Sequence, residues 1–310
     1  MAAASAPRNR AFSAPACLGR ARERRDHPGM RRLVRWNLSS RARQLAGGDA
    51  IVVSIPKSGR TWVRTFLCAY FCEKIGQPFT LEPEKYESVP QIIYTHDLFE
   101  QRTKADRWDR LRGKYLIPQR DRTGRPIILL ARDPRDAFVS LYIQLTRRTK
   151  ETPDELKQMS ASELLRDPAF GIESMVEIMN SWLAEWADRA DFLLLRYEGL
   201  RSDPGSEFRR LLQVLGERRL EEKAFSHALE FSDFGHMKKL ESAGAFASKI
   251  LRAGDTKDPE SFKVRRGRIG GFEDYLSPND QVYAAAALQE LDPCFDYGGR
   301  AAGHSGGAAS

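Results

Sequence analysis

Four short apolar runs alternate with segments of helical periodicity along most of the chain. The runs cover residues 51–55, 91–97, 127–131 and 192–196. Short runs rich in Ile, Val and Leu are typical of buried strands, whereas apolar residues spaced three and four apart predict helices. That helical spacing recurs after Thr61, over 172–186, over 208–215 and over 281–291. The alternation predicts an α/β fold, a single three-layer domain with a central, mainly parallel sheet.

The first apolar run leads into the most informative local pattern. Pro56 ends the predicted strand because it has no N–H for a sheet ladder. Gly59 permits a tight turn, and a helix then runs from Thr61 to a stop at Gly76. A strand, a small-residue loop and a helix N-terminus in this order can hold an anion on backbone N–H groups. The loop is not a Walker A motif, because Lys57 precedes the glycine instead of following it.

Two later strand ends also carry chemistry. His96 lies at the end of the 91–97 run, and open α/β sheets keep their ligands at the carboxyl ends of their strands. A surface histidine is the alternative, but this position favours a catalytic base. After the run 127–131, Asp133 is expected to cap a helix whose first residue is Pro134. The sequence therefore predicts polar groups from neighbouring strands at one edge of the sheet.

Composition and charge narrow the class of protein. The chain has 310 residues, 41% of them hydrophobic, which is enough for a sizeable core, and a net charge of +8. Residues 1–48 hold eleven Arg and only two acids, so the remainder is close to neutral and is not expected to bind nucleic acid. No apolar run approaches the roughly 20 residues that a membrane span requires. Cys68 and Cys72 lie four apart on the first predicted helix, too far for an unstrained disulfide, and favour reduced thiols in a cytoplasmic protein.

The two ends of the chain differ from its centre. We expect residues 1–48 to be a basic leader, 49–298 the domain, and 299–310 a flexible tail. The leader lacks the apolar stretch of a secretory signal. It is interpreted as a disordered arm, as translated sequence upstream of a start at Met30 or as a targeting segment, and the first two are favoured. A short basic helix is expected over 31–45.

Five sequence motifs, in order, resemble those of the sulfotransferases that use 3′-phosphoadenosine 5′-phosphosulfate (PAPS), in particular the cytosolic type. They are P-K-S-G-R-T-W at 56–62, Y-T-H at 94–96, R-D-P-R-D-x-x-x-S at 132–140, Y-E-G-L at 197–200, and the pair F-S-D-F-G-H-M-K-K at 231–239 and R-R-G at 265–267. The resemblance covers residues 49–298. It implies transfer of a sulfuryl group from PAPS to a hydroxyl or amine, without a metal ion.

The resemblance also implies roles for individual residues. Lys57 would offset charge on the leaving phosphate, His96 would take the acceptor's proton, and Ser140 would assist Arg132 at the 3′-phosphate. The residues expected to bind the donor are Lys57, Ser58, Gly59, Arg60, Thr61, Trp62, Arg132, Ser140, Tyr197, Ser232, Phe234, Arg265, Arg266 and Gly267.

The chain departs from the family pattern in places. Arg60 replaces a family threonine and adds positive charge beside the donor, and Arg266 replaces a lysine. Gly271 and Phe272 stand where the family has an acid and a tryptophan, which puts the details of this lid in doubt. The acceptor stays unidentified, since the loops at 77–90, 100–125 and 144–170 carry no readable code.

Two other functions stay open at this point. A Mg²⁺-dependent P-loop kinase would share the strand–loop–helix but should carry a G-K-[ST] and a Walker-type Asp, and neither is evident. A non-catalytic nucleotide-binding protein would need neither Lys57 nor His96. The base could also be Asp97 or Glu100, and the sequence does not indicate the oligomeric state.

Overall fold

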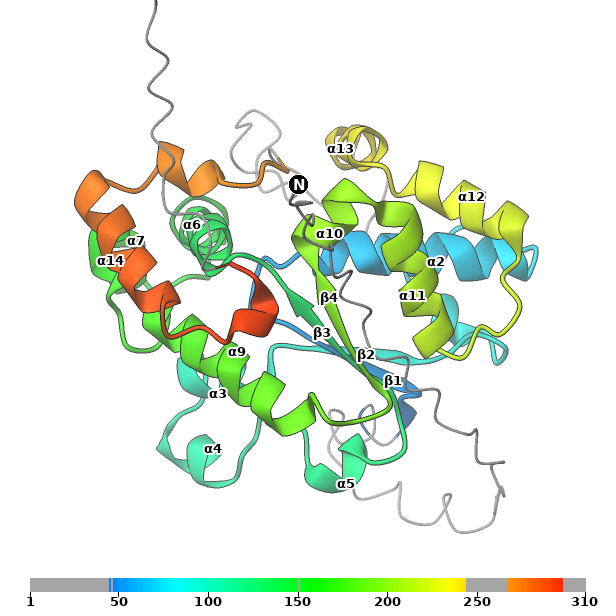
Figure 1. Ribbon diagram of the computed structural model, residues 1–310, viewed down its shortest axis with the longest axis horizontal. Coiled ribbons are helices and arrows are strands. Elements are labelled where there is room, and N and C mark those ends of the chain that lie inside the picture. Colours follow the sequence, from blue (N-terminus) through cyan, green and yellow to red (C-terminus); the bar gives the residue numbers. More distant parts are fainter. Residues whose placement is uncertain (1–44, 46, 150, 244–266, 298–310) are drawn as a thin grey trace, which may run out of the picture.

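The computed structural model has a central sheet that is parallel throughout (Figure 1). It describes residue 45 and residues 47–149, 151–243 and 267–297. Its order is β2-β1-β3-β4, with β1 at Ala50–Val53, β2 at Ile92–Thr95, β3 at Ile127–Ala131 and β4 at Phe192–Arg196. The register pairs Val53 with Thr95, and Ala131 with Arg196. All four strands therefore deliver their following residues to one edge of the sheet.

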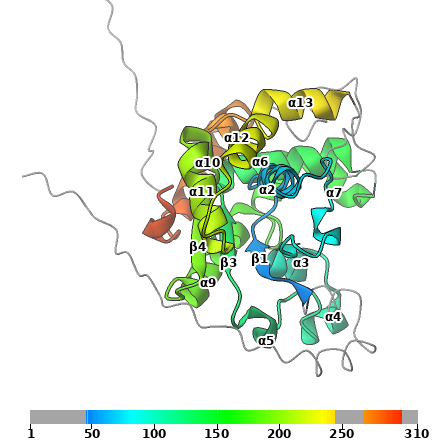
Figure 2. The same ribbon diagram turned by 90° about the vertical axis from the view of Figure 1, so that its right-hand side faces the viewer.

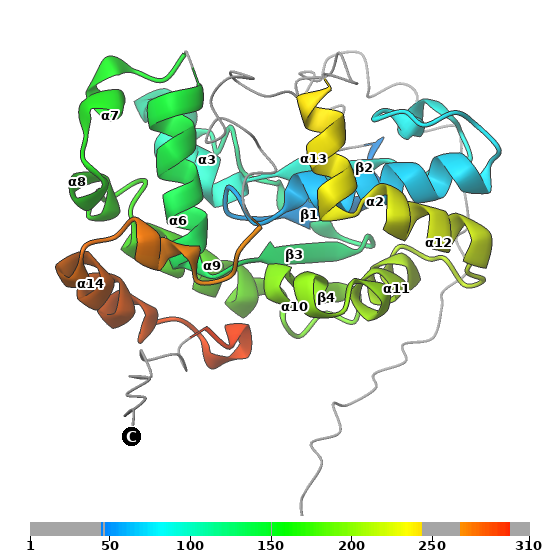
Figure 3. The same cartoon turned by 90° about the horizontal axis from the view of Figure 1, so that it is seen from above.

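The strands are apolar because both faces of the sheet are covered. On one face, Ile51, Val53 and Leu129 pack in a cluster with α6, α9 and α14. On the other face, Val52 and Ile128 join a cluster with α2, α11 and α12. Successive strand residues point to opposite faces, so a strand buried on both sides has no polar alternation. Figures 2 and 3 show the resulting helix–sheet–helix layers. The expected α/β fold is confirmed.

The helices occupy the connections between strands and the C-terminal third of the chain. The α-helices are α2 (Arg60–Lys74), α3 (Asp97–Thr103), α4 (Arg107–Leu111), α5 (Gln119–Arg122), α6 (Pro134–Ile143), α7 (Asp154–Gln158), α8 (Ala161–Leu165), α9 (Ile172–Trp186), α10 (Tyr197–Ser202), α11 (Pro204–Val214), α12 (Glu222–Phe231), α13 (Phe234–Ser242) and α14 (Pro278–Leu288). The shorter helical segments are η2 (Pro83–Lys85), the π-helical η3 (Gln144–Arg148), η6 (Gly271–Asp274) and η7 (Pro293–Phe295). No helix of the described part is long and apolar enough to cross a membrane.

Several predicted boundaries shift where a cap or a loop determines the end. The first strand ends at Val53 rather than residue 55, and the second ends at Thr95, so that His96 begins a helix instead of ending a strand. The helix predicted from residue 208 starts at Pro204, because Asp203 accepts a hydrogen bond from Ser206 N. The helix predicted from residue 281 starts at Pro278 behind the Ser277 cap and ends at Leu288. The strands at 127–131 and 192–196 and the helix at 172–186 match their predicted bounds.

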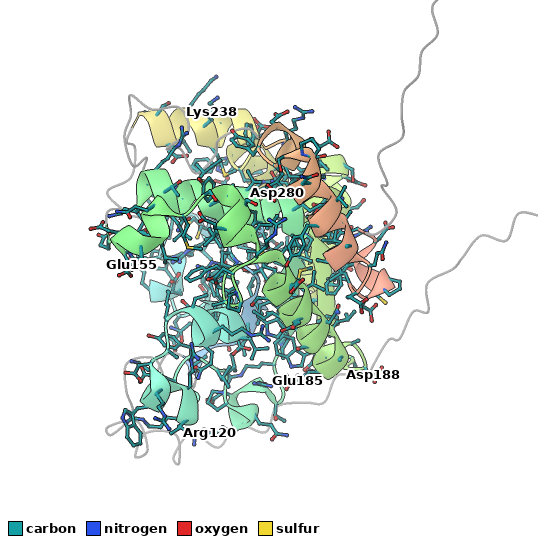
Figure 4. The ribbon with its side chains drawn as sticks, turned by 90° about the vertical axis from the view of Figure 1, so that its left-hand side faces the viewer. Arg120, Glu155, Glu185, Asp188, Lys238 and Asp280 are labelled. Carbon is teal, nitrogen blue, oxygen red and sulfur yellow. The ribbon has the colours of Figure 1, made fainter. Side chains whose placement is uncertain are left out.

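The two ends of the molecule along the strand direction differ in content. The carboxyl ends of β3 and β4 point toward α6, α10 and α13, whereas α4 and α5 lie at the opposite end (Figure 1). Figure 4 likewise shows Lys238 of α13 far from Arg120 of α5.

Leu45, which the sequence assigned to the leader, is buried in the core. The helix expected over 31–45 lies, apart from Leu45, outside the described residues, as do Arg265 and Arg266.

Candidate active site

The loop between β1 and α2 forms the centre of the site. Lys57 has a φ of 70° and Gly59 a φ of 95°, so the chain passes twice through the left-handed region before the helix begins. The Ser58 hydroxyl donates to Ile55 O at 3.1 Å and closes the turn. A Cβ on Gly59 would lie 2.7 Å from Cδ2 of Tyr197. Glycine is therefore required both for the backbone conformation and for the approach of the tyrosine ring.

Arg132, the residue after β3, binds directly to this loop. Its Nη1 donates to Lys57 O at 3.1 Å, and its guanidinium lies 4.5 Å from the centroid of the Tyr197 ring. The Lys57 ammonium donates to Oε1 of Gln144 at 3.0 Å, at the start of the π-helical segment η3. Two cations from adjacent strands thus meet at the carboxyl edge, as the sequence predicts.

His96 lies on the other side of the same loop. Its Nδ1 is 2.7 Å from Ser54 O, and a carbonyl oxygen can only accept, so Nδ1 carries the proton. In the neutral ring Nε2 then keeps its lone pair, as a general base requires. Burial, with the positive charge of Arg60 as the second cause, lowers the pKa of His96 from 6.5 to about 3. The imidazole is therefore in its basic form at neutral pH.

The two acidic residues that were alternative bases have other partners. Asp97 is buried, with Oδ1 accepting from Ile117 N at 2.7 Å and Oδ2 from Trp182 Nε1 at 3.1 Å. Its φ of 39° is strained for a non-glycine residue and is stabilised by these bonds. Glu100 is ion-paired with Lys104 at 2.8 Å. Asp97 therefore fixes the start of α3, which favours His96 as the base.

A group of aromatic and polar side chains extends from the loop toward α13. Trp62 packs edge-to-face on Tyr197, with ring centroids 5.9 Å apart, and a Cβ on Gly267 would overlap the ring of Phe234. Three buried polar atoms here have no hydrogen-bond partner in the described part of the chain: Trp62 Nε1, Arg132 Nε and Ser232 Oγ. Buried donors without partners are rare in proteins and indicate a ligand or water. Indole, guanidinium and hydroxyl groups fit a nucleotide with phosphate groups.

The other predicted donor-binding residues are placed with less detail. Ser140 is half-buried on α6, and its hydroxyl makes no hydrogen bond to any other described residue. Arg60 and Thr61 begin α2 and are half-buried. Arg265 and Arg266 fall outside the described residues. The structure thus brings together the loop, Arg132, Tyr197 and the 232–234 turn.

Asp136 is a site residue that the sequence did not indicate. Its Oδ2 accepts from Gly270 N at 2.9 Å and its Oδ1 from Phe272 N at 3.0 Å, while Arg132 Nη2 lies 3.8 Å away. Burial raises the pKa of this carboxyl group, with Arg132 opposing that shift. One carboxylate thus ties the end of the lid segment to the arginine beside the loop. Its place four residues after Arg132, in the same R-D-P-R-D motif, is the signal that could have found it.

A second network lies beside the site, and its charged groups are paired with one another. Arg135 binds both oxygens of Asp133, with Nη2 to Oδ2 at 2.7 Å, and Glu198 accepts from Asp133 N at 3.0 Å. The other oxygen of Glu198 accepts from the Tyr297 hydroxyl at 2.7 Å. This network fastens Tyr297 to the β3–α6 corner. Among the described residues no cluster of three metal-ligating side chains occurs.

Known proteins resemble this chain over most of its length. A family model for the sulfotransferase domain matches residues 48–291. Cytosolic sulfotransferase 17 of Arabidopsis thaliana is 26% identical over 247 residues, which covers 74% of this chain and 70% of that protein. The 3-alpha-hydroxysteroid sulfotransferase of Cavia porcellus is 26% identical over 235 residues, covering 74% of this chain and 78% of that protein.

Solved structures share the fold. Mouse sulfotransferase SULT7A1 complexed with PAP (adenosine 3′,5′-bisphosphate) aligns with a TM-score of 0.53 at 18% identity, covering 79% of this chain and 84% of that chain. Retinol dehydratase in a complex with retinol and PAP also aligns with a TM-score of 0.53 at 18% identity, covering 79% of this chain and 82% of that chain. At this identity the likeness concerns the fold alone.

Proposed function

The chain belongs to the sulfotransferase domain family, and on that premise we propose that its carboxyl-edge site transfers a sulfuryl group from PAPS to a hydroxyl or amine with Lys57, Arg132 and His96 as the acting residues. One observation carries this proposal. Arg132 binds Lys57 O at 3.1 Å and His96 binds Ser54 O at 2.7 Å, so a single loop holds two cations and a base.

Donor binding is proposed to use the loop and the side chains without partners. N–H groups of Ser58 to Thr61 and the N-terminus of α2 would hold the 5′-phosphosulfate. Arg132 would bind the 3′-phosphate, because a guanidinium matches phosphate oxygens bidentately. Trp62, Tyr197, Ser232 and Phe234 would line the nucleoside site, where Trp62 Nε1 and Ser232 Oγ await partners.

The chemistry follows from the charges. Sulfuryl transfer breaks the bond between sulfur and the bridging phosphate oxygen and forms a bond from sulfur to the acceptor oxygen or nitrogen. Lys57 would neutralise the charge that grows on the leaving oxygen. His96 would accept the acceptor's proton on Nε2, while Ser54 O holds Nδ1–H and fixes the tautomer. Ser140 would add a hydroxyl donor near the 3′-phosphate.

We propose a cytoplasmic location, supported by the cytosolic type of the relatives and by the buried free thiols of Cys68 and Cys72. A tagged protein found only inside an organelle would contradict it. We also propose that no metal ion takes part in the transfer. EDTA should therefore leave the transfer rate unchanged.

The experiment that tests the proposed function is a calorimetric titration with three nucleotides. PAP should bind much more tightly than 5′-AMP, because each charge-assisted contact to the 3′-phosphate contributes about 1.5–3 kcal/mol. ATP with Mg²⁺ serves as the third ligand and represents the kinase alternative. Equal affinities for PAP and 5′-AMP would remove the sulfotransferase assignment of this site.

A further inference from the structure

Arg60 and Arg64 lie one turn apart on the same face of α2 but differ in their partners. Arg64 donates to Leu81 O at 3.0 Å, lies 3.6 Å from Glu84, and covers the ring of Tyr94 at 5.3 Å. Arg60 makes no hydrogen bond or ion pair within the described part of the chain, although its side chain is half-buried. The helix therefore presents one paired guanidinium and one whose five N–H donors have no acceptor among the described residues.

Arg60 lies on the β2 side of the donor loop. The residue begins α2 directly after the donor loop, and side chains of a helix lean toward its N-terminus. Apart from Arg64 on its own helix, its electrostatic neighbours are Tyr94 of β2, His96 at the N-cap of α3 and Glu100 of α3. Arg132, the proposed 3′-phosphate residue, follows β3 on the other side of β1. Arg60 thus lies on the side of the base and the acceptor.

A half-buried cation beside a catalytic base needs a counterion. Glu100 attracts Arg60, but its Oε1 is bound to the Lys104 ammonium at 2.8 Å. An unpaired charge taken out of water is costly, and a guanidinium fork fits carboxylate, sulfate and phosphate groups bidentately. Resting on the proposed function, we propose that Arg60 selects acceptors that carry an oxyanion, such as a carboxylate or a sulfate or phosphate ester, near the hydroxyl that receives the sulfuryl group.

In the free site, the positive charge of Arg60 lowers the pKa of His96 and so opposes its action as a base. The groups that act on the charge of His96 are Arg60 from α2, Glu100 and Lys104 from α3, and Ser54 O after β1. Of these, Arg60 has the largest effect after burial, and it lowers the pKa of His96. An acceptor oxyanion bound to Arg60 would cancel that charge and raise the pKa of His96 toward its ordinary value, where an imidazole takes up a proton more readily. Binding of the acceptor would then make His96 a stronger base.

The test uses the complex of the full-length protein with PAP and two matched phenols, 3-(4-hydroxyphenyl)propionate and its methyl ester. Calorimetry should show that the wild type binds the acid more tightly than the ester. Arg60→Thr should remove this preference by weakening the acid alone, roughly 10- to 100-fold. Arg60→Lys, which keeps the charge without the fork, should weaken the acid less. Arg64→Thr is the matched control and should keep the preference.

Each remaining result decides against the proposal or against its premise. Equal affinities for acid and ester, absence of binding by the acid, or a preference that survives in Arg60→Thr would overturn the oxyanion assignment. Loss of PAP affinity in Arg60→Thr with an unchanged acid preference would make Arg60 a donor residue and would also overturn it. If wild-type protein fails to distinguish PAP from 5′-AMP, the proposed function fails instead, because that comparison does not involve Arg60's acceptor role.

Discussion

Two clusters of charge lie side by side at the carboxyl edge of the sheet, and they differ in how completely their polar atoms are paired. The locking corner comprises Asp133, Arg135, Glu198 and Tyr297, which satisfy one another in a chain of hydrogen bonds. The active corner comprises Lys57, His96 and Arg132, and here Arg132 Nε is buried without a partner. Arg132 and Arg135 come from one five-residue motif.

The difference separates charges that are paired within the fold from charges that we propose to act on a ligand. A buried charge that finds its counterion inside the fold, as Arg135 does in Asp133, holds elements together. A buried donor without a partner keeps its bonding capacity for a ligand. Sequence shows only that both arginines follow β3, whereas pairing assigns them to different tasks.

The largest expected effect is on chemistry in the active corner. His96→Asn keeps a polar side chain but cannot accept a proton near neutral pH, so turnover with PAPS should fall roughly 10²–10⁴-fold. PAP affinity should stay at the wild-type value, since His96 is proposed to meet only the acceptor. Initial rates and calorimetry on the same preparation measure both.

His227→Asn is the control, because His227 is exposed on α12, where it contacts the Phe231 ring, and it has no proposed chemical role. It should keep its activity. Near-normal turnover of His96→Asn would move the base elsewhere and break the proposed composition of the active corner.

The second prediction replaces each of the two arginines of the motif by methionine in turn. Arg135→Met leaves Asp133 buried with an uncompensated charge and should destabilise the protein by about 3–5 kcal/mol. Arg132→Met should cost less stability, because part of its guanidinium is unpaired, but should abolish the preference for PAP over 5′-AMP. Thermal melts and nucleotide calorimetry on both variants give the comparison. Equal stability losses would show that the pairing of Arg135 adds nothing to the fold.

A smaller effect is expected at Asp136, the carboxylate that joins the active corner to the lid segment. Asp136→Asn replaces one acceptor with an NH₂ group that faces a backbone N–H, so the tie to Gly270 or Phe272 is lost. PAP affinity should fall about tenfold, the scale of one charge-assisted hydrogen bond, while 5′-AMP affinity should not change. Asp274→Asn is the matched control on the same segment, since Asp274 is exposed. A tighter PAP complex would instead show that Asp136 competes with the 3′-phosphate for Arg132.

The smallest expected effect concerns acid stability. The pKa of His96 is lowered to about 3 in the fold, so between that value and its ordinary 6.5 the unfolded chain binds more protons than the folded one. Stability contributed by the neutral imidazole is therefore present above pH 6.5 and is lost as pH falls below it. His96→Asn should show a shallower loss of unfolding free energy between pH 7 and pH 5 than the wild type. Parallel curves would show that His96 titrates normally in the fold.

Local chemistry made much of the fold predictable. The strands at 127–131 and 192–196 match their predicted bounds because each is a continuous apolar run between polar residues. The Asp133–Pro134 cap was also predicted correctly, since both residues act on their own helix. The first two strands were predicted too long, because the chain leaves the sheet to build the loop and the His96 turn before the run of suitable residues ends.

The site was predictable only as far as motifs reach. Lys57, Arg132 and His96 were expected at one edge, and parallel register brings them there. The bond from Lys57 to Gln144 and the role of Asp97 depend on contacts between distant segments, which no local pattern encodes. Asp97 was considered as a base because it adjoins His96, yet its side chain is engaged by Trp182. The residue-level roles in binding and catalysis stay predictions.

The contact between Gly59 and the Tyr197 ring also determines when the site comes into being during synthesis. The loop leaves the ribosome early, but the ring that packs on it is translated only after three further strands and the helices between them. A nascent chain that ends before β4 lacks both this strand and the Tyr197 ring that follows it and packs on the loop. A nucleotide at the proposed donor site would therefore stabilise the finished domain but not its precursors, because a ligand stabilises only the state that binds it. Even in cells rich in the donor, the chain would have to fold as far as β4 without stabilisation by the nucleotide.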